Sequence, residues 1–137
     1  MWWTYALLSA VFAALTAIFA KIGIKNVNPD LATAIRTVVI LLIAWGIVLF
    51  KGSGRQAHDL TQQNWTFLLL FGCATGLSWI FYFKALQLGE VSQVAPVDKL
   101  SVAIAIILSA IFLGEPLTIK TVLGAGLIIG GTFVLIF

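Results

Sequence analysis

Long apolar runs alternate with short polar connections along the whole chain. Five of these runs reach about 20 residues, the length that an α-helix needs to cross the hydrocarbon core of a bilayer. They cover residues 2–20, 31–50, 65–83, 91–113 and 119–137. The pattern predicts an all-α integral membrane protein with five transmembrane helices in a single domain, residues 1–137.

The connections carry turn signals. Asn28, Pro29 and Asp30 are expected to stop the first helix and start the second. The longest connection, residues 51–64, contains glycine, polar residues and the single histidine, His58. A lone loop histidine without a second His or Cys cluster is not a metal site, so we expect no metal.

Composition supports the membrane assignment. Of the 137 residues, 61% are hydrophobic and 9% are charged, whereas soluble domains average roughly 45–50% and about 25%. The net charge of +3 is small and dispersed, which argues against a nucleic-acid partner. The single cysteine, Cys73, has no partner for an internal disulfide and is expected to be a small packing residue. The chain has no phosphate-binding loop, no dinucleotide-binding loop and no Ser-His-Asp set, so neither an enzyme nor a cofactor is expected.

Basic residues are nearly balanced between the two sides of the predicted bundle. One side carries Lys51, Arg55 and Lys120, and the other carries Lys21, Lys25 and Lys84. Arg36 and Lys99 lie inside spans, near the second side. Lys and Arg favour cytoplasmic loops, so this weak bias permits insertion in both orientations, that is, a dual topology.

Polar residues recur at helical spacing inside four of the five spans. Positions three and four apart share one face of a helix, so each set forms a stripe. The stripes are Tyr5, Ser9 and Thr16; Thr33, Arg36 and Thr37; Thr75, Ser78, Trp79 and Tyr82; and Asp98, Ser101, Ala105 and Ser109. Polar groups facing lipid are costly, so we interpret these stripes as the lining of a wet, partly aromatic cavity.

The fourth span also holds a proline and two charges close together. Pro96 removes one helical hydrogen bond and is expected to loosen the turn that carries Asp98. We interpret Pro96, Asp98, Lys99 and Ser101 as part of a solute site or its gate. An acid at this depth is a candidate for exchanging a proton for the solute.

Structural explanations of the same residues stay open. Arg36 and Lys99 are long enough to extend to the lipid headgroups. Asp98 could pair with Arg36 or Lys99 as a lock between helices. The hydroxyl groups could bond the backbone of their own helices and serve packing alone. Glu115 with Pro116 is interpreted as a structural turn.

Glycines mark the third and fifth spans. Small residues let helices approach closely, and Gly126 with Gly130 and Gly72 with Gly76 have the four-residue spacing of such contacts. Gly124 and Gly131 lie in the same fifth span. We assign the fifth span to packing or dimerisation and the first four spans to the cavity.

Several of these features together resemble one protein family. The strongest block is FYFKALQLGEVSQVAPVDKLSVAIAIILSAIFLGEPLT, followed by LGAGLIIGGTFVLI. Ala20-Lys21 at the end of the first span, Ala34-Ile35-Arg36 in the second and the Pro-x-Asp-Lys-Leu-Ser form at residues 96–101 also fit. With these motifs the chain resembles a single five-helix repeat of the EamA family, in the drug/metabolite transporter superfamily.

The resemblance implies transport of a small solute across a membrane, expected to be the plasma (inner) membrane of a prokaryote. Many members carry two repeats in inverted orientation, whereas this chain has one. The distantly related small multidrug resistance proteins assemble short chains as antiparallel homodimers, and the last helix resembles their dimerising helix. By that analogy we expect a homodimer. The alternatives are a non-transporting membrane subunit that regulates a partner, or one half of a paired transporter.

The substrate class stays open. Aromatic residues with an acid suit an organic cation, whereas Arg36 suits a carboxylate, and a zwitterion would use both.

Overall fold

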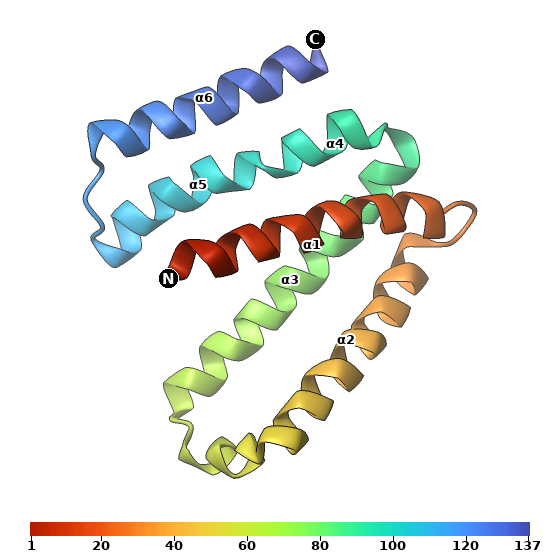
Figure 1. Ribbon diagram of the computed structural model, residues 1–137, viewed down its shortest axis with the longest axis vertical. Coiled ribbons are helices and arrows are strands. Elements are labelled where there is room, and N and C mark those ends of the chain that lie inside the picture. The colour runs from red at the N-terminus through yellow and green to blue at the C-terminus, as the bar shows by residue number, and fades with distance from the viewer. The chain divides into compact units, whose positions relative to one another are not determined.

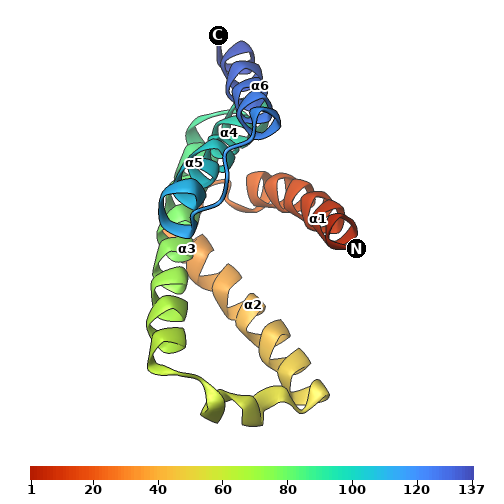
Figure 2. The same ribbon diagram turned by 90° about the vertical axis from the view of Figure 1, so that its left-hand side faces the viewer.

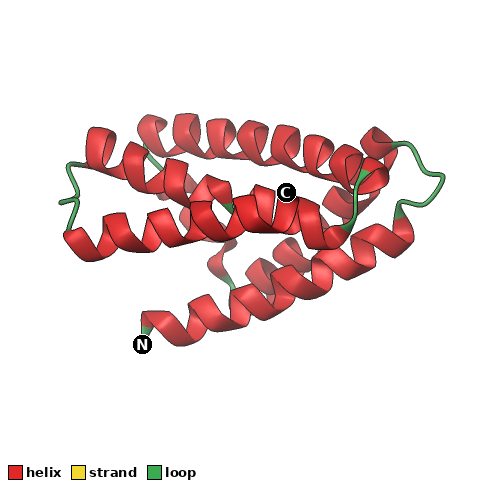
Figure 3. Cartoon of the chain, turned by 90° about the horizontal axis from the view of Figure 1, so that it is seen from above, coloured by secondary structure: helices red, strands yellow, loops and turns green.

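The computed structural model describes residues 1–137, and it consists of helices and connections without strands (Figure 3). The helices in chain order are α1 (Trp2–Gly23), α2 (Pro29–Lys51), the 3₁₀ helix η1 (Ser53–Asp59), α3 (Gln62–Leu88), α4 (Val91–Asp98), α5 (Leu100–Leu108), the π-helix η2 (Ser109–Leu113) and α6 (Ile119–Ile136) (Figure 1). The helical class predicted from the apolar runs is confirmed.

Five stretches are long and apolar enough to cross a membrane, as predicted. They are α1, α2, α3, the combined segment Val91–Leu113 and α6, with mean hydropathies between 1.7 and 2.3. Large apolar side chains are exposed along all of them, for example Phe12 at 66%, Leu42 at 68% and Phe71 at 69%. Apolar surface of this extent suits lipid rather than water.

Local signals explain where α2 begins and ends. The Asn28 side chain accepts a hydrogen bond of 2.8 Å from the backbone N–H of Asp30, and Pro29 occupies the first helical position. At the other end Gly52 adopts φ of 67°, a left-handed conformation that glycine reaches without steric cost, and closes the helix. The predicted stop and restart at Asn28 to Asp30 is therefore confirmed.

The third helix is longer than the predicted range of 65–83. Thr61 caps its start, because its Oγ1 accepts a hydrogen bond of 3.2 Å from the N–H of Asn64. At the other end the helix continues through Lys84-Ala85-Leu86-Gln87-Leu88, a run of good helix formers, to Leu88. Polar residues at both ends concealed these turns from a prediction based on apolar runs.

The fourth span is interrupted, whereas the sequence predicted one helix over 91–113. α4 ends at Asp98, Lys99 lies between the helices, and α5 begins at Leu100. The last turn is the π-helix η2, which ends at Leu113 and is capped by Gly114 with φ of 68°. An extended segment then leads to Thr118, whose side chain caps α6 by accepting from the N–H of Thr121 at 3.2 Å.

The chain forms two compact units. The first comprises residues Met1–Lys21 and Ala85–Phe137, and in it α6 packs along α4 and α5 (Figures 1 and 2). The second comprises Ile22–Lys84, in which η1 joins α2 to α3. Within the second unit, α2 and α3 converge toward the start of α2 and spread apart toward η1 (Figure 2).

Candidate functional site

Arg36 and Trp79 form the most distinctive contact inside the second unit. The guanidinium carbon Cζ of Arg36 lies 3.6 Å from the centroid of the Trp79 ring. A separation this short fits two planar groups stacked face to face, the arrangement that arginine favours on aromatic rings. The contact joins α2 to α3 at the end where these helices converge.

Two further rings extend this contact along α3. Tyr82 meets Trp79 nearly edge-on, with ring centroids 5.3 Å apart and planes at 79°. The Phe83 ring lies at the same centroid distance from the Trp79 ring, and the planes of these two rings form an angle of 58°. Residues three and four apart share a helix face, so the sequence places all three rings together. We call Arg36, Trp79 and Tyr82 the arginine–aromatic cluster.

Local hydrogen bonds use the threonine hydroxyls of the predicted stripes. Each donates to the main-chain carbonyl four residues earlier in its own helix. The bonds are Thr16 to Phe12 at 2.7 Å, Thr33 to Pro29 at 2.9 Å, Thr37 to Thr33 at 2.7 Å and Thr75 to Phe71 at 2.8 Å. The single hydrogen of such a hydroxyl is already used in this bond, so the hydroxyl can only accept a hydrogen bond from a solute.

Four other hydroxyl residues of the stripes are exposed on their helices. Tyr5 and Ser9 lie on α1, Ser78 on α3 and Ser101 on α5. The structure therefore presents these four groups at the surface of the single chain.

Pro96 lies three residues before the interruption between α4 and α5. A proline has no N–H to donate, and its ring crowds the carbonyl four residues earlier. The turn that follows tightens: the N–H of Lys99 lies 3.0 Å from the carbonyl oxygen of Pro96 and 3.3 Å from that of Ala95. The N–H of Val102 in turn bonds the Lys99 carbonyl at 3.0 Å. These short-range bonds belong to a 3₁₀-type turn at the Asp98–Lys99 segment, directly after Pro96.

Asp98 pairs with its neighbour in the sequence. Oδ2 of Asp98 lies 3.2 Å from Nζ of Lys99, and the Lys99 and Asp98 side chains are 56% and 36% exposed. An ion pair between adjacent residues of one span does not tie two helices together. A pair this exposed is typically worth about 0–1 kcal/mol. The carboxylate is thus accessible at the interruption.

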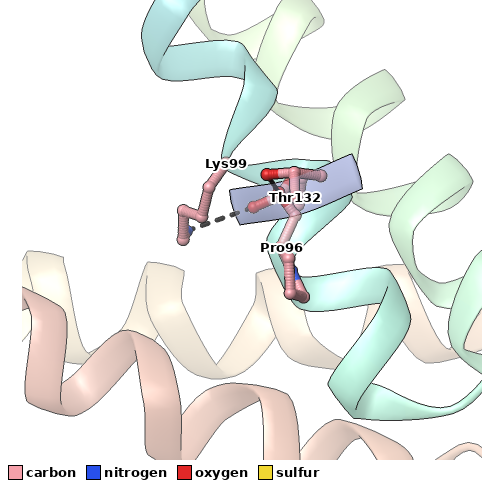
Figure 4. Close-up of polar contacts among 4 residues, drawn as sticks. Pro96, Lys99 and Thr132 are labelled. Carbon is pink, nitrogen blue, oxygen red and sulfur yellow. Dashed lines mark hydrogen bonds and ion pairs between the residues drawn. The ribbon is translucent and has the colours of Figure 1, made fainter. Parts of the chain in front are cut away.

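Thr132 holds this interruption from the side of α6, and sequence reasoning missed it (Figure 4). Its Oγ1 donates to the Ile128 carbonyl at 2.8 Å and lies 3.2 Å from the Pro96 carbonyl oxygen. The residue is only 3% exposed. Its position in the sequence could have indicated this role. Thr132 is the one hydroxyl residue in the second half of α6, and the other residues of that half are glycine or large apolar residues.

Lys21 is the second residue that sequence reasoning missed as a contact. Its Nζ donates to the carbonyl oxygens of Leu86 at 2.5 Å and Gly89 at 2.7 Å. Both carbonyls belong to the end of α3 and the turn after it, where helical carbonyls have no partner in the helix. A lysine at the end of α1 therefore caps α3 within the first unit.

The glycines of α6 lie outside its packing face. The face of α6 that packs against α4 and α5 consists of buried or half-buried residues, namely Thr121, Ala125, Ile129, Thr132 and Ile136. A Cβ atom added at any of the predicted packing glycines would meet nothing within 4 Å, and this holds for Gly72, Gly76, Gly124, Gly126, Gly130 and Gly131. These glycines thus make no close helix contact within the chain.

An open, mainly apolar pocket of about 370 Å³ lies in the first unit, lined by Ala85, Gln93, Val94, Val97 and Ile136. None of the predicted cavity residues lines it. No group of three or more His, Cys, Asp or Glu is arranged to hold a metal ion.

Comparison with known proteins identifies relatives over the full length of the chain. A family model described as the EamA-like transporter family matches residues 1–137. The chain is 48% identical to a Sinorhizobium protein named "Uncharacterized transporter in cobO 3'region", over 98% of this chain and 95% of the relative. No solved structure matches the chain.

Two further relatives differ in length. The chain is 30% identical to an uncharacterized protein of Methanocaldococcus jannaschii, over 94% of this chain and 91% of that protein. It is also 30% identical to the uncharacterized transporter YxxF of Bacillus subtilis, over 93% of this chain but only 40% of YxxF. Relatives therefore occur both at the length of this chain and at more than twice that length.

Proposed function

Because the chain belongs to the EamA-like transporter family, we propose that it carries a small metabolite or drug-like solute across a membrane as an antiparallel homodimer. The five apolar spans make it a multi-pass membrane protein. Relatives that are named transporters support the same activity.

The interrupted fourth span is the observation that carries this proposal. Transporters often bind solutes where a transmembrane helix is discontinuous. Here the break places the accessible Asp98 carboxylate beside Lys99, after Pro96.

We propose that the polar stripes of the first four spans line the solute pathway of the assembly. The residues are Tyr5, Ser9, Thr16, Thr33, Arg36, Thr37, Thr75, Ser78, Trp79, Tyr82, Pro96, Asp98, Lys99 and Ser101. Asp98 is proposed to exchange a proton for the solute, because an acid in a span is a common proton relay.

Two observations support a homodimer. YxxF is long enough to hold a second five-helix repeat beyond the part that matches this chain, and a second copy of the chain would supply the same helices. The glycines of α6 are unused inside the chain and offer a smooth surface for close helix contact. The near-even distribution of basic residues supports an antiparallel arrangement of the two copies.

Reconstitution tests the proposal. Purified chain in liposomes is supplied with a panel of metabolites, with and without an imposed pH gradient, and uptake is compared with empty liposomes. We expect at least one solute to accumulate, and faster when the gradient is present. If a folded, self-associated preparation moves no solute under any gradient, the transport proposal fails, and a non-transporting or paired subunit takes its place.

A further inference from the structure

Arg36 is a cation inside a membrane span without an acidic partner. The acidic residues of its own unit are Asp30 and Asp59, in the first turn of α2 and in η1. Neither forms an ion pair with it, since the ion pair in the structure joins Asp98 and Lys99. A charge in a span normally faces the protein interior or water and is paired there. The second unit therefore presents a positive charge whose partner is not part of that unit.

The stack on Trp79 does not take the place of an anion, because a ring stacked on the face of the guanidinium does not accept from the N–H donors at its edge. Cζ of the group lies over the Trp79 ring, 3.6 Å from its centroid, a separation that fits face-to-face stacking. The N–H donors of arginine lie in the plane of the group and point outward from its edge. Stacking therefore fixes the plane of the fork and leaves its donor edge uncovered by the ring. An oriented planar fork is preorganised for bidentate binding of an oxyanion.

The same contact disfavours an organic cation. Cation recognition by tryptophan uses the face of the ring, and Arg36 already occupies a face of Trp79. An approaching ammonium group would also meet the charge of Arg36. Lys25 and Lys84 lie toward the same end of the unit, before α2 and one to two turns beyond Trp79 in α3, and add to the positive potential.

The charge count selects the type of anion. One guanidinium compensates one negative charge, and Arg36 is the charged member of the cluster. A phosphate dianion would keep excess charge in an apolar environment, which is costly. A carboxylate matches both the single charge and the two-pronged geometry of arginine. The rings of Trp79 and Tyr82 next to the fork suit an apolar body attached to that carboxylate.

We propose that the arginine–aromatic cluster is the recognition site for the carboxylate of a small organic monoanion. The inference rests on the proposed transport function and names its substrate class. Arg36 binds the carboxylate through the edge of its guanidinium, Trp79 holds the guanidinium plane, and Tyr82 braces the Trp79 ring.

A binding experiment tests the site on the purified full chain in maltoside detergent, which contains no anionic group. The probes are benzoate, phenylacetate and 3-phenylpropionate, each compared with its amide and its amine. Binding is measured by equilibrium dialysis at millimolar concentrations. We expect the carboxylates to bind and the matched amides and amines to bind about tenfold more weakly or not at all. The absence of carboxylate binding, or a preference for the amines, overturns the proposal.

Three variants localise the site. Arg36→Gln is expected to weaken carboxylate binding by about tenfold or more, and Arg36→Lys, which keeps the charge but not the fork, by several-fold. Arg55→Gln removes an exposed arginine of η1 and is the matched control, with binding expected to be unchanged. Equal binding by the wild-type and both Arg36 variants contradicts the assignment. If Arg36→Gln does not fold, the Arg36→Lys variant and the wild-type probe series still decide the question.

Transport assays separate this inference from the function on which it rests. Liposomes that accumulate amines but not carboxylates keep the transport function and overturn the carboxylate site. Carboxylate binding that depends on Arg36, without uptake of any solute, keeps the site and overturns the transport function. Displacement of bound carboxylate by added phosphatidylglycerol, but not by its zwitterionic counterpart, identifies the cluster as a lipid headgroup site and contradicts the proposal.

Discussion

The hydroxyl of Thr132 in α6 lies 3.2 Å from the carbonyl oxygen of Pro96 in α4. This contact bridges two helices three residues before the interruption of the fourth span at Lys99. The same hydroxyl bonds the Ile128 carbonyl at 2.8 Å, so its single hydrogen is shared between its own helix and the neighbouring one. The interruption at Lys99 is therefore supported by a neighbouring helix and is a defined feature of the fold.

Thr132→Val tests the strength of this support. The substitution keeps the side-chain shape and removes the donor to a nearly buried site. We expect a loss of about 0.5–1.5 kcal/mol in the free energy of unfolding in bicelles. Thr66→Val is the matched control, because Thr66 is exposed and bonds only the Gln62 carbonyl of its own helix at 3.0 Å. Equal stability of the two variants would show that the bridge contributes nothing.

Lys21→Met is expected to loosen the end of α3. The lysine supplies a charged donor to the carbonyls of Leu86 and Gly89, and its loss leaves both without that partner. Bonds to charged groups contribute about 1.5–3 kcal/mol, so we expect a destabilisation of that order. Hydrogen exchange should accelerate around residues 85–89. Lys25→Met, at an exposed lysine of the next connection, is the control, and the same exchange pattern in both variants would contradict the capping role.

Asp98→Asn separates proton coupling from a structural lock. The partner of Asp98 is the exposed Lys99, so loss of the pair is expected to lower stability by no more than about 1 kcal/mol. Uptake driven by a pH gradient should be lost, because the amide cannot carry the proton. Asp59→Asn, at an exposed acid of η1, is the control for coupling, and Lys99→Gln removes the same ion pair as a control for stability.

Two results would count against this role of Asp98. The first is a stable Asp98→Asn variant that is still driven by the proton gradient. The second is a large and equal loss of stability in Asp98→Asn and Lys99→Gln, which a structural lock requires.

Gly126→Leu and Gly130→Leu test whether α6 forms the contact between two copies of the chain. Both positions have open space within the chain, so the larger side chain should leave the fold of the single chain intact. We expect the cross-linked dimer yield in lipid to fall several-fold, since leucine keeps two helix backbones apart. Gly46→Leu in α2 also meets open space and serves as the control. Unchanged dimer yields in both α6 variants would place the dimer interface elsewhere.

The five spans were predictable because membrane insertion imposes a length of apolar sequence that is visible residue by residue. The break in the fourth span was not, because Lys99 differs from a continuous helix only in hydrogen bonds that shift by one residue. Pro96 signalled weakness in the span. The sequence did not show that the helix is interrupted at Lys99, three residues after the proline.

Among the candidate residues, the helix faces were predictable from the sequence, whereas the contacts between helices were not. The faces holding Arg36 and Trp79 were predicted separately, but their contact depends on how α2 and α3 converge, which no local pattern specifies. Lys21 and Thr132 escaped because both bind main-chain carbonyls, which every residue carries and which no residue type reveals. The solute pathway and the dimer stay predictions for the experiments described here.

Uptake by orientation-locked chains tests whether two oppositely oriented copies form one transporter. Gln56→Lys with Ala57→Lys adds positive charge to η1 on one side of the membrane, and Leu88→Lys with Ser92→Lys adds it to the other, all at exposed positions. Added lysines should fix each chain in a single orientation, which a C-terminal reporter verifies. Uptake in cells is then measured for each locked chain alone and for both together. We expect little uptake by either chain alone and recovery when they are co-expressed, whereas full uptake by one singly oriented chain would show that an antiparallel pair is not required.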